Sequence, residues 1–163
     1  MKKTQRGFAL LVAIIFMSVM LSFGLALGSI GYKQQILASA AVESQYAFYA
    51  ADAALECALY ADQQQNLFDF STHDTTTHPN TITCDGAPAT ELSYAYTIGV
   101  QMVVSERLSL DSGKRCAIVT VYKPAPGTGL TYIFSQGFDV SCTTVISPPT
   151  GARFVSRGLN AHY

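Results

Sequence analysis

The pattern of hydrophobic positions divides the chain into two parts. No charge occurs from Phe8 to Ile30, and as a helix this segment is roughly 35 Å long, enough to cross a bilayer core. Residues 31–62 contain no proline and are rich in Ala, Leu, Gln and Glu, which favour helix. The pattern predicts one long helix with a membrane-spanning half, 8–30, and an amphipathic half, 31–62.

The amphipathic half carries two apolar lines at helical spacing. The first consists of Leu37, Ala41, Ser44, Phe48, Ala51, Leu55 and Ala58, widened by Leu59. The second consists of Val42, Tyr46, Tyr49, Ala53 and Tyr60. A helix with two apolar faces needs two partners. We expect the first line to pack under the chain's own sheet and the second to contact neighbouring subunits; the alternative is one domain that covers both lines.

The remainder of the chain has turn and strand patterns. Residues 63–93 are mostly polar and predict a loop region. Within 94–163, four short runs with aromatic, β-branched or alternating residues predict an antiparallel meander: 94–104, 116–122, 130–142 and 153–159. Gly137 is expected to mark a bulge. A sheet that buries one face on the helix gives a two-layer α+β domain.

The four cysteines are expected to form two disulfides. None belongs to a CxxC pair, and an even number beyond an apolar segment fits an oxidising compartment. A hairpin around residues 124–129 would fold Cys142 back toward Cys116. That favours a Cys116–Cys142 bridge and leaves Cys57 and Cys84 to hold the loop region to the helix. Free buried thiols are the alternative.

Charge is unevenly distributed. Lys2, Lys3 and Arg6 precede the apolar segment and should stay cytoplasmic. Without these three, seven of the ten Lys/Arg face eleven Asp/Glu, a net charge of −4. A mildly acidic remainder argues against a dedicated nucleic-acid binder, so no nucleic-acid partner is expected. Arg153 and Arg157 form the one basic pair that a DNA-uptake role would use; decoration of an edge strand is the plainer interpretation.

The residues around the start of the apolar segment carry a family resemblance. Gly7 and Phe8, after the basic leader KKTQRG, resemble the prepilin peptidase site of type IV pilins and pseudopilins. Residues 47–59, AFYAADAALECAL, resemble the helix of minor pilins of the PilX type. The resemblance implies cleavage between Gly7 and Phe8, methylation of the new N-terminus, and a pilin-like fold. It also implies prepilin peptidase, other pilin subunits and the cytoplasmic membrane as partners.

One position departs from the family pattern. Its members usually have Glu at the fifth residue of the mature chain, where this sequence has Val12. The resemblance implies that such a Glu pairs with a neighbour's N-terminal amine during assembly. Val12 therefore favours a minor subunit, including one at the filament tip, over an ordinary shaft subunit. A divergent lineage that dispenses with the Glu is the competing explanation.

These observations predict a structural protein rather than an enzyme. We expect a minor subunit of a type IV pilus or a type II secretion-like pseudopilus, first inserted once in the cytoplasmic membrane with its N-terminus inside, then part of a cell-surface filament. Phe8, Val12, Tyr46 and Tyr49 are the predicted assembly residues. The alternative is an adhesin that does not polymerise, either anchored or released at a signal-peptide site, Ala26-Leu27-Gly28.

No catalytic motif is present in the sequence, and no cofactor or metal is expected. His73, Asp74 and His78 are of types that bind zinc or copper. Their order on a polar loop favours solvated loop residues instead.

Overall fold

The computed structural model describes residues 5–163, with side chains for 8–28 and 30–163. Lys2 and Lys3 of the predicted leader, and the side chain of Arg6, lie outside the described residues. The chain forms two units that meet at the boundary between Ala41 and Val42. A single helix, α1 (Gln5–Gln63), contributes to both.

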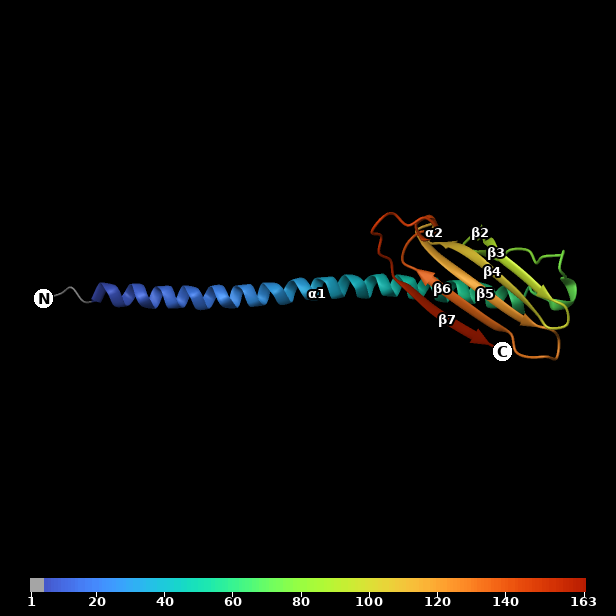
Figure 1. The fold of residues 1–163 in the computed structure, drawn as a ribbon, viewed down its shortest axis with the longest axis horizontal. Coiled ribbons are helices and arrows are strands. Elements are labelled where there is room, and N and C mark those ends of the chain that lie inside the picture. The colour runs from blue at the N-terminus through green and yellow to red at the C-terminus, as the bar shows by residue number, and fades with distance from the viewer. Residues whose placement is uncertain (1–4) are drawn as a thin grey trace. The chain divides into compact units, whose positions relative to one another are not determined.

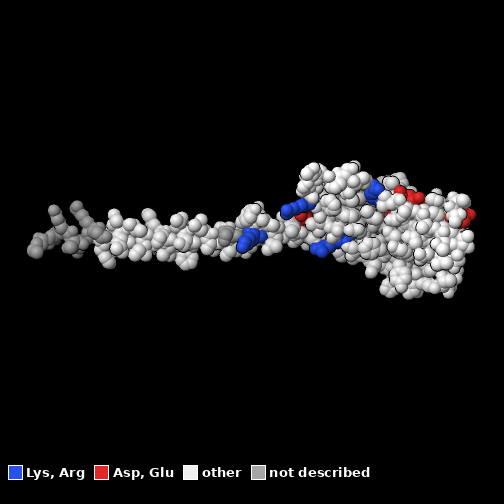
Figure 2. All heavy atoms as spheres, viewed as in Figure 1, with Lys and Arg blue, Asp and Glu red and all other residues white. Residues whose placement is uncertain are grey.

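The first unit is the N-terminal part of α1. Its large hydrophobic side chains between Phe8 and Ile30 are 44–73% exposed. The helix is long and apolar enough to span a membrane. In Figure 2 this stretch is almost entirely free of the colours that mark charged residues. The first part of the predicted helix thus exists, and none of its large side chains is covered by the chain itself.

The second unit combines the C-terminal part of α1 with a five-stranded antiparallel sheet that follows chain order (Figure 1). This is the expected α+β layout. The strands are β3 (Thr90–Thr97), β4 (Gln101–Leu110), β5 (Arg115–Pro124), β6 (Tyr132–Phe138) and β7 (Ser156–His162). Before them come the 3-10 helix η1 (Phe70–Thr72) and the short hairpin of β1 (Thr83–Cys84) and β2 (Ala87–Pro88); α2 (Cys142–Ile146) lies between β6 and β7.

Small residues bring α1 close to the sheet. Its buried positions in this unit are mostly alanines: Ala47, Ala50, Ala51, Ala54, Ala58 and Ala61. The sheet meets them with larger side chains, among them Met102, Leu108 and Ile133, all 0–1% exposed. The core is therefore built from large residues on the strands and small ones on the helix, which gives close packing across the layer.

Gly137 is the point of closest approach, which corrects the expected bulge. It pairs in regular register with Ala117 and Arg157. A Cβ there would lie 2.2 Å from the carbonyl oxygen of Ala47 and 2.3 Å from the amide nitrogen of Ala51. The glycine is thus required by contact between strand and helix backbones. The register shift of this sheet lies instead between Glu91 and Ser93.

The first apolar line of the helix is only partly buried. Ala51 and Ala58 are fully buried, whereas Phe48 is 43% exposed and Leu37 69% exposed. The expectation that all seven residues pack under the sheet was wrong, because the close approach admits alanine and excludes phenylalanine. Every residue of the second line is exposed, as expected for that face: Val42, Tyr46, Tyr49, Ala53 and Tyr60.

The strand boundaries also differ from the sequence-based ones. The run 94–104 is not one strand: β3 ends at Thr97, a turn follows, and β4 begins at Gln101. Gly99 adopts a φ of 68° in that turn, a conformation that suits glycine. Because the run is divided between β3 and β4, the sheet has five strands where four were expected. The last strand begins at Ser156 rather than Arg153, and the region 63–93 contains η1, the β1–β2 hairpin and the start of β3.

Two disulfides join elements of the second unit. Cys57 on α1 is bonded to Cys84 on β1, and Cys116 on β5 is bonded to Cys142 at the start of α2. This is the pairing that the predicted β5–β6 hairpin favours. The first bridge fastens the β1–β2 hairpin to the helix, and the second fastens α2 to the sheet.

Candidate assembly surface

The predicted processing and assembly residues fall in different units. Gly7 lies within α1, and Phe8 and Val12 are 72% and 48% exposed on the same helix. Tyr46 and Tyr49 belong to the second unit and are 46% and 64% exposed. The chain therefore presents two separate surfaces: an apolar helix around Phe8 and Val12, and an aromatic helix face around the two tyrosines.

The aromatic face borders a cavity of about 470 Å³. Its α1 wall is formed by Tyr46, Tyr49, Ala50 and Ala53. The opposite wall comes from the β1–β2 turn and from the β4–β5 connection. The residues on that wall are Cys84, Asp85, Leu110, Asp111 and Arg115. The volume lies within the range of pockets that hold small ligands or inserted side chains.

Two turns place the acidic residues of this wall. Asp85 and Gly86 join β1 to β2 with φ of 52° and 74°, which is the pattern of a tight hairpin turn. Asp111, Ser112 and Gly113 join β4 to β5, also with positive φ. Asp85 accepts a hydrogen bond from the Ser112 amide at 3.4 Å, so the two turns contact one another. The sequences Asp-Gly and Asp-Ser-Gly were the signals for these two turns. The pattern of apolar runs alone did not identify the turns.

Arg115 is fixed at the inner side of the cavity. Its guanidinium lies over the Tyr46 ring, 4.3 Å from the centroid, a cation–π geometry. Its Nη1 donates to the Asp139 carbonyl oxygen at 2.6 Å. Its buried Nε has no acceptor among the described residues. Because Cys116 next to it is bonded to Cys142, this cation is held by a cross-linked part of the sheet.

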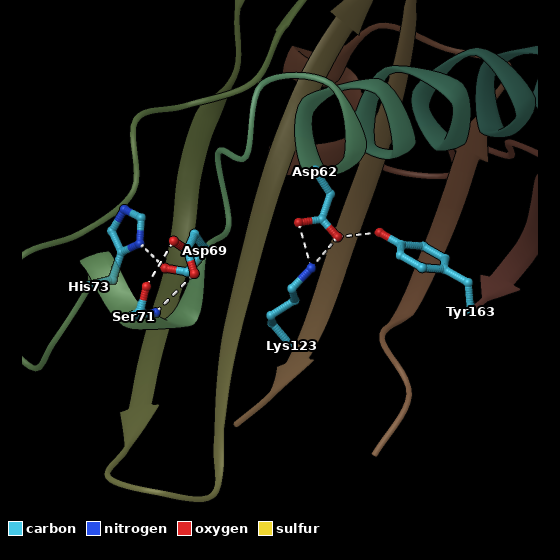
Figure 3. Close-up of polar contacts among 6 residues, drawn as sticks. All are labelled: Asp62, Asp69, Ser71, His73, Lys123 and Tyr163. Atoms are coloured by element: carbon cyan, nitrogen blue, oxygen red, sulfur yellow. Dashed lines mark hydrogen bonds and ion pairs between the residues drawn. The ribbon is translucent and has the colours of Figure 1, made fainter. Parts of the chain in front are cut away.

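A second polar cluster closes the far end of the unit (Figure 3). Asp62, 4% exposed at the end of α1, accepts from Lys123 Nζ at 2.8 and 2.6 Å and also from the Tyr163 hydroxyl. Burial and the bond to Asp62 raise the pKa of Tyr163 above its ordinary value. All three side chains satisfy one another, so the cluster ties helix, sheet and C-terminal residue together.

The polar loop residues each serve a local contact. His73 Nδ1 lies 2.7 Å from the Asp69 carbonyl oxygen, and a side-chain hydrogen bond from Thr76 lowers the pKa of Asp74 to about 2. His78 lies 3.2 Å from the Glu91 carboxylate. Among the described residues no three His, Cys, Asp or Glu side chains are grouped to hold a metal. Loop stabilisation accounts for what the structure shows of these side chains.

The basic pair near the C-terminus is divided in the structure. Arg157 on β7 donates through Nε to Ser44 Oγ at 2.7 Å and so links the edge strand to α1. Arg153 is exposed before β7 begins. These positions give Arg157 a structural contact within the unit.

Comparisons of the chain with protein-family models, with curated proteins and with solved structures return no match. The molecule offers an uncovered apolar helix and an acid-flanked aromatic cavity, both of which suit non-covalent association.

Proposed function

We propose that this chain is a structural minor subunit of a type IV pilus or of a type II secretion-like pseudopilus. One observation carries the proposal: α1 continues without interruption from an exposed, uncharged segment into a segment that is packed on its own sheet. Such a helix can be held in a membrane at one end and carry a folded unit at the other. The resemblance of Gly7 and Phe8 to a prepilin peptidase site supports the same proposal.

The apolar segment supplies the assembly mechanism. In the membrane, lipid covers the side chains from Phe8 to Ile30. After cleavage behind Gly7, the mature helix leaves the bilayer, and packing against the same segment of neighbouring subunits replaces the lipid. Removing this much apolar surface from water is strongly favourable, so the subunit is stable either in lipid or among other helices. Val12, with no carboxylate to pair with an amine, supports a minor position in the filament.

Two features of the second unit, its disulfides and its exposed tyrosines, support the same role. The two disulfides hold the β1–β2 hairpin and α2 on a small domain, as suits a part exposed outside the membrane. The exposed tyrosines beside the cavity provide a second surface for contact with other subunits. Aromatic residues of this kind are enriched where proteins associate.

The test is the mature N-terminus, measured by intact-mass and peptide mass spectrometry after co-expression with a prepilin peptidase. We expect a chain that begins at Phe8 and carries one added methyl group. A Gly7→Val variant should remain uncut, while Gly24→Ala, which changes a glycine within the helix, should be processed normally. A chain that begins near Ser29 would make this a secreted domain. An uncut chain that stays in the membrane would favour an anchored adhesin.

A further inference from the structure

Lys33 is a lone cation on an exposed apolar helix face. Between Phe8 and Val42 it is the sole charged residue of the sequence. Ile30, Ile36 and Leu37, three or four positions away and so on the same face, are 52%, 51% and 69% exposed. This part of α1 is therefore a basic, apolar strip that the chain itself leaves uncovered.

Assembly changes the surroundings of that cation. In the membrane-inserted state, Lys33 follows the apolar segment closely and can reach lipid headgroups. A helix that leaves the bilayer to pack among other proteins loses those headgroups. A desolvated ammonium needs a carboxylate to offset the cost of burial. The assembled state therefore requires acids on the surface that receives this strip.

Most acids of the second unit already have a use. Asp62, Asp69, Asp74, Glu91 and Asp139 each accept from a donor of their own, and Glu106 is buried. On α1, Glu43 also has a contact of its own, and Asp52 and Glu56 lie outside the cavity lining. Asp85 and Asp111 are exposed, and Asp85 makes one long bond to a backbone amide. They are the two acids that line the cavity beside Tyr46 and Tyr49.

We propose that this cavity receives the Ile30–Leu37 strip of a second copy of the chain, with Lys33 of that copy against the carboxylates of Asp85 and Asp111. The apolar flanks of the strip match the walls formed by Tyr46, Tyr49 and Leu110. Arg115 already lies over the Tyr46 ring, so it is the Tyr49 ring that favours a nearby ammonium. Two carboxylates face one guanidinium, that of Arg115, in this lining, so the cavity still complements a cation, and this fixes which part of the helix enters. The inference rests on the proposed function, since it names one contact of the assembled state.

The proposed contact is head-to-tail, because it joins two different surfaces of the chain. The strip and the cavity are different surfaces, so every copy offers one of each. Such a heterologous contact leaves a free strip and a free cavity on the terminal copies, and repetition extends the assembly. A head-to-tail contact of this kind generates a filament unless its rotation closes a ring.

Zero-length carbodiimide cross-linking of the mature full-length chain tests the contact directly. This reagent joins an amine to a carboxylate only when they touch. Assemblies made from equal parts ¹⁵N-labelled and unlabelled chain are cross-linked, digested and analysed by mass spectrometry. We expect peptides that join Lys33 to Asp85 or Asp111, half of them with one labelled and one unlabelled partner. Cross-links from Lys33 to other acids alone, or none from Lys33, would overturn the proposal.

A double-mutant cycle measures the coupling. Lys33→Gln and the pair Asp85→Asn/Asp111→Asn remove the charges, and Asn tolerates the positive φ of both acidic positions. We expect each change to weaken self-association about tenfold in sedimentation equilibrium, and the combination to weaken it no further. Arg153→Gln, the same loss of charge on an exposed residue, should have no effect. Additive losses would show that Lys33 acts elsewhere, such as at lipid headgroups, and would contradict the proposal.

The two proposals fail in distinguishable ways. A chain processed to Phe8 that assembles without the Lys33 cross-links would overturn this contact and leave the proposed function standing. An uncut chain that does not self-associate would overturn both.

Discussion

The two stretches of α1, residues 8–41 and 42–63, reverse the usual relation between side-chain size and burial. In the first, Leu, Ile and Phe are more than 40% exposed. In the second, the fully buried positions are alanines. The difference shows that burial here is decided by what approaches the helix. A sheet approaches the second stretch so closely that only small residues fit, whereas the large side chains of the first stretch are exposed.

A methyl group added at Gly137 should destabilise the second unit strongly, because helix and strand backbones are in contact there. Gly137→Ala would place a methyl group within 2.3 Å of two backbone atoms of α1, and neither helix nor strand can move without disturbing the core. We expect the free energy of unfolding to fall by about 4 kcal/mol. Urea unfolding of the full-length chain in mild detergent, followed by near-UV circular dichroism of the tyrosines, measures it. Gly129→Ala is the matched control.

Gly129 sits where an added Cβ would meet Pro124 at an ordinary 3.7 Å. That variant should lie within about 0.5 kcal/mol of the unchanged chain. Equal stability of the two glycine variants would mean that the backbones of helix and sheet are not in contact, and that close approach does not decide which residues of α1 are buried.

Removing the disulfide on α1 should destabilise the second stretch and leave the first unchanged. The Cys57–Cys84 bridge spans 27 residues of sequence and fastens the β1–β2 hairpin to the second stretch of α1. Cys57→Ala/Cys84→Ala should lower the free energy of unfolding by about 3.5 kcal/mol, because the unfolded chain loses a closed loop. The same unfolding experiment measures it. Helicity of residues 8–41, read by amide hydrogen exchange in lipid, should stay unchanged; its loss would contradict the independence of the two stretches.

The sequence predicted the α+β layout because periodicity is strong where elements are long. An uncharged run of helix length, a proline-free continuation and alternating runs around a Pro-Gly turn needed no tertiary information. The residues at which strands begin and end were harder to predict. The run 94–104 is rich in aromatic and β-branched residues, so apolar content alone hides the turn at Gly99. In β4, the buried Glu106 interrupts the apolar alternation of Met102, Val104, Leu108 and Leu110.

The candidate surface was predictable only in part. Tyr46 and Tyr49 follow from helical spacing, since they lie on one line of the helix. Asp85 and Asp111 lie 26 residues apart on separate turns, and no local pattern indicates that the Ser112 amide joins them. The alanine line also escaped prediction, because hydropathy ranks Phe48 and Leu37 above alanine while the distance between helix and sheet decides burial.

Two isoleucines, one in each unit, differ in burial. Ile133 on β6 is fully buried, whereas Ile14 on α1 is 60% exposed. Ile133→Ala should lower the free energy of unfolding by about 3 kcal/mol through lost burial and a cavity. Ile14→Ala should change it by less than about 0.5 kcal/mol. Denaturant titration of both variants checks this. A similar loss from Ile14→Ala would mean that the first stretch packs on the folded unit.

A weaker, pH-dependent effect is expected at Glu106, an acid buried beneath the sheet. Glu106 is 2% exposed; its Oε2 accepts from the Ile82 amide at 2.9 Å, and its Oε1 has no partner among the described residues. Burial raises the pKa of Glu106 above its ordinary value. As pH rises through the ordinary range of a carboxyl group, the unfolded chain loses this proton before the folded chain does, so Glu106 stabilises the fold at low pH and less so above its folded pKa.

Glu106→Gln removes that dependence while keeping the shape and an acceptor for Ile82. At pH 4 the variant should match the unchanged chain within about 1 kcal/mol. At higher pH it should become progressively more stable relative to the unchanged chain. Urea unfolding of both chains from pH 4 to 8 measures the difference, in which all other titrating groups cancel. No carboxylate occurs from Phe8 to Ala41, so the exposed stretch contributes nothing to an acid-range slope. Parallel curves would show that Glu106 titrates as it does in water, and that the core beneath β4 is open to solvent.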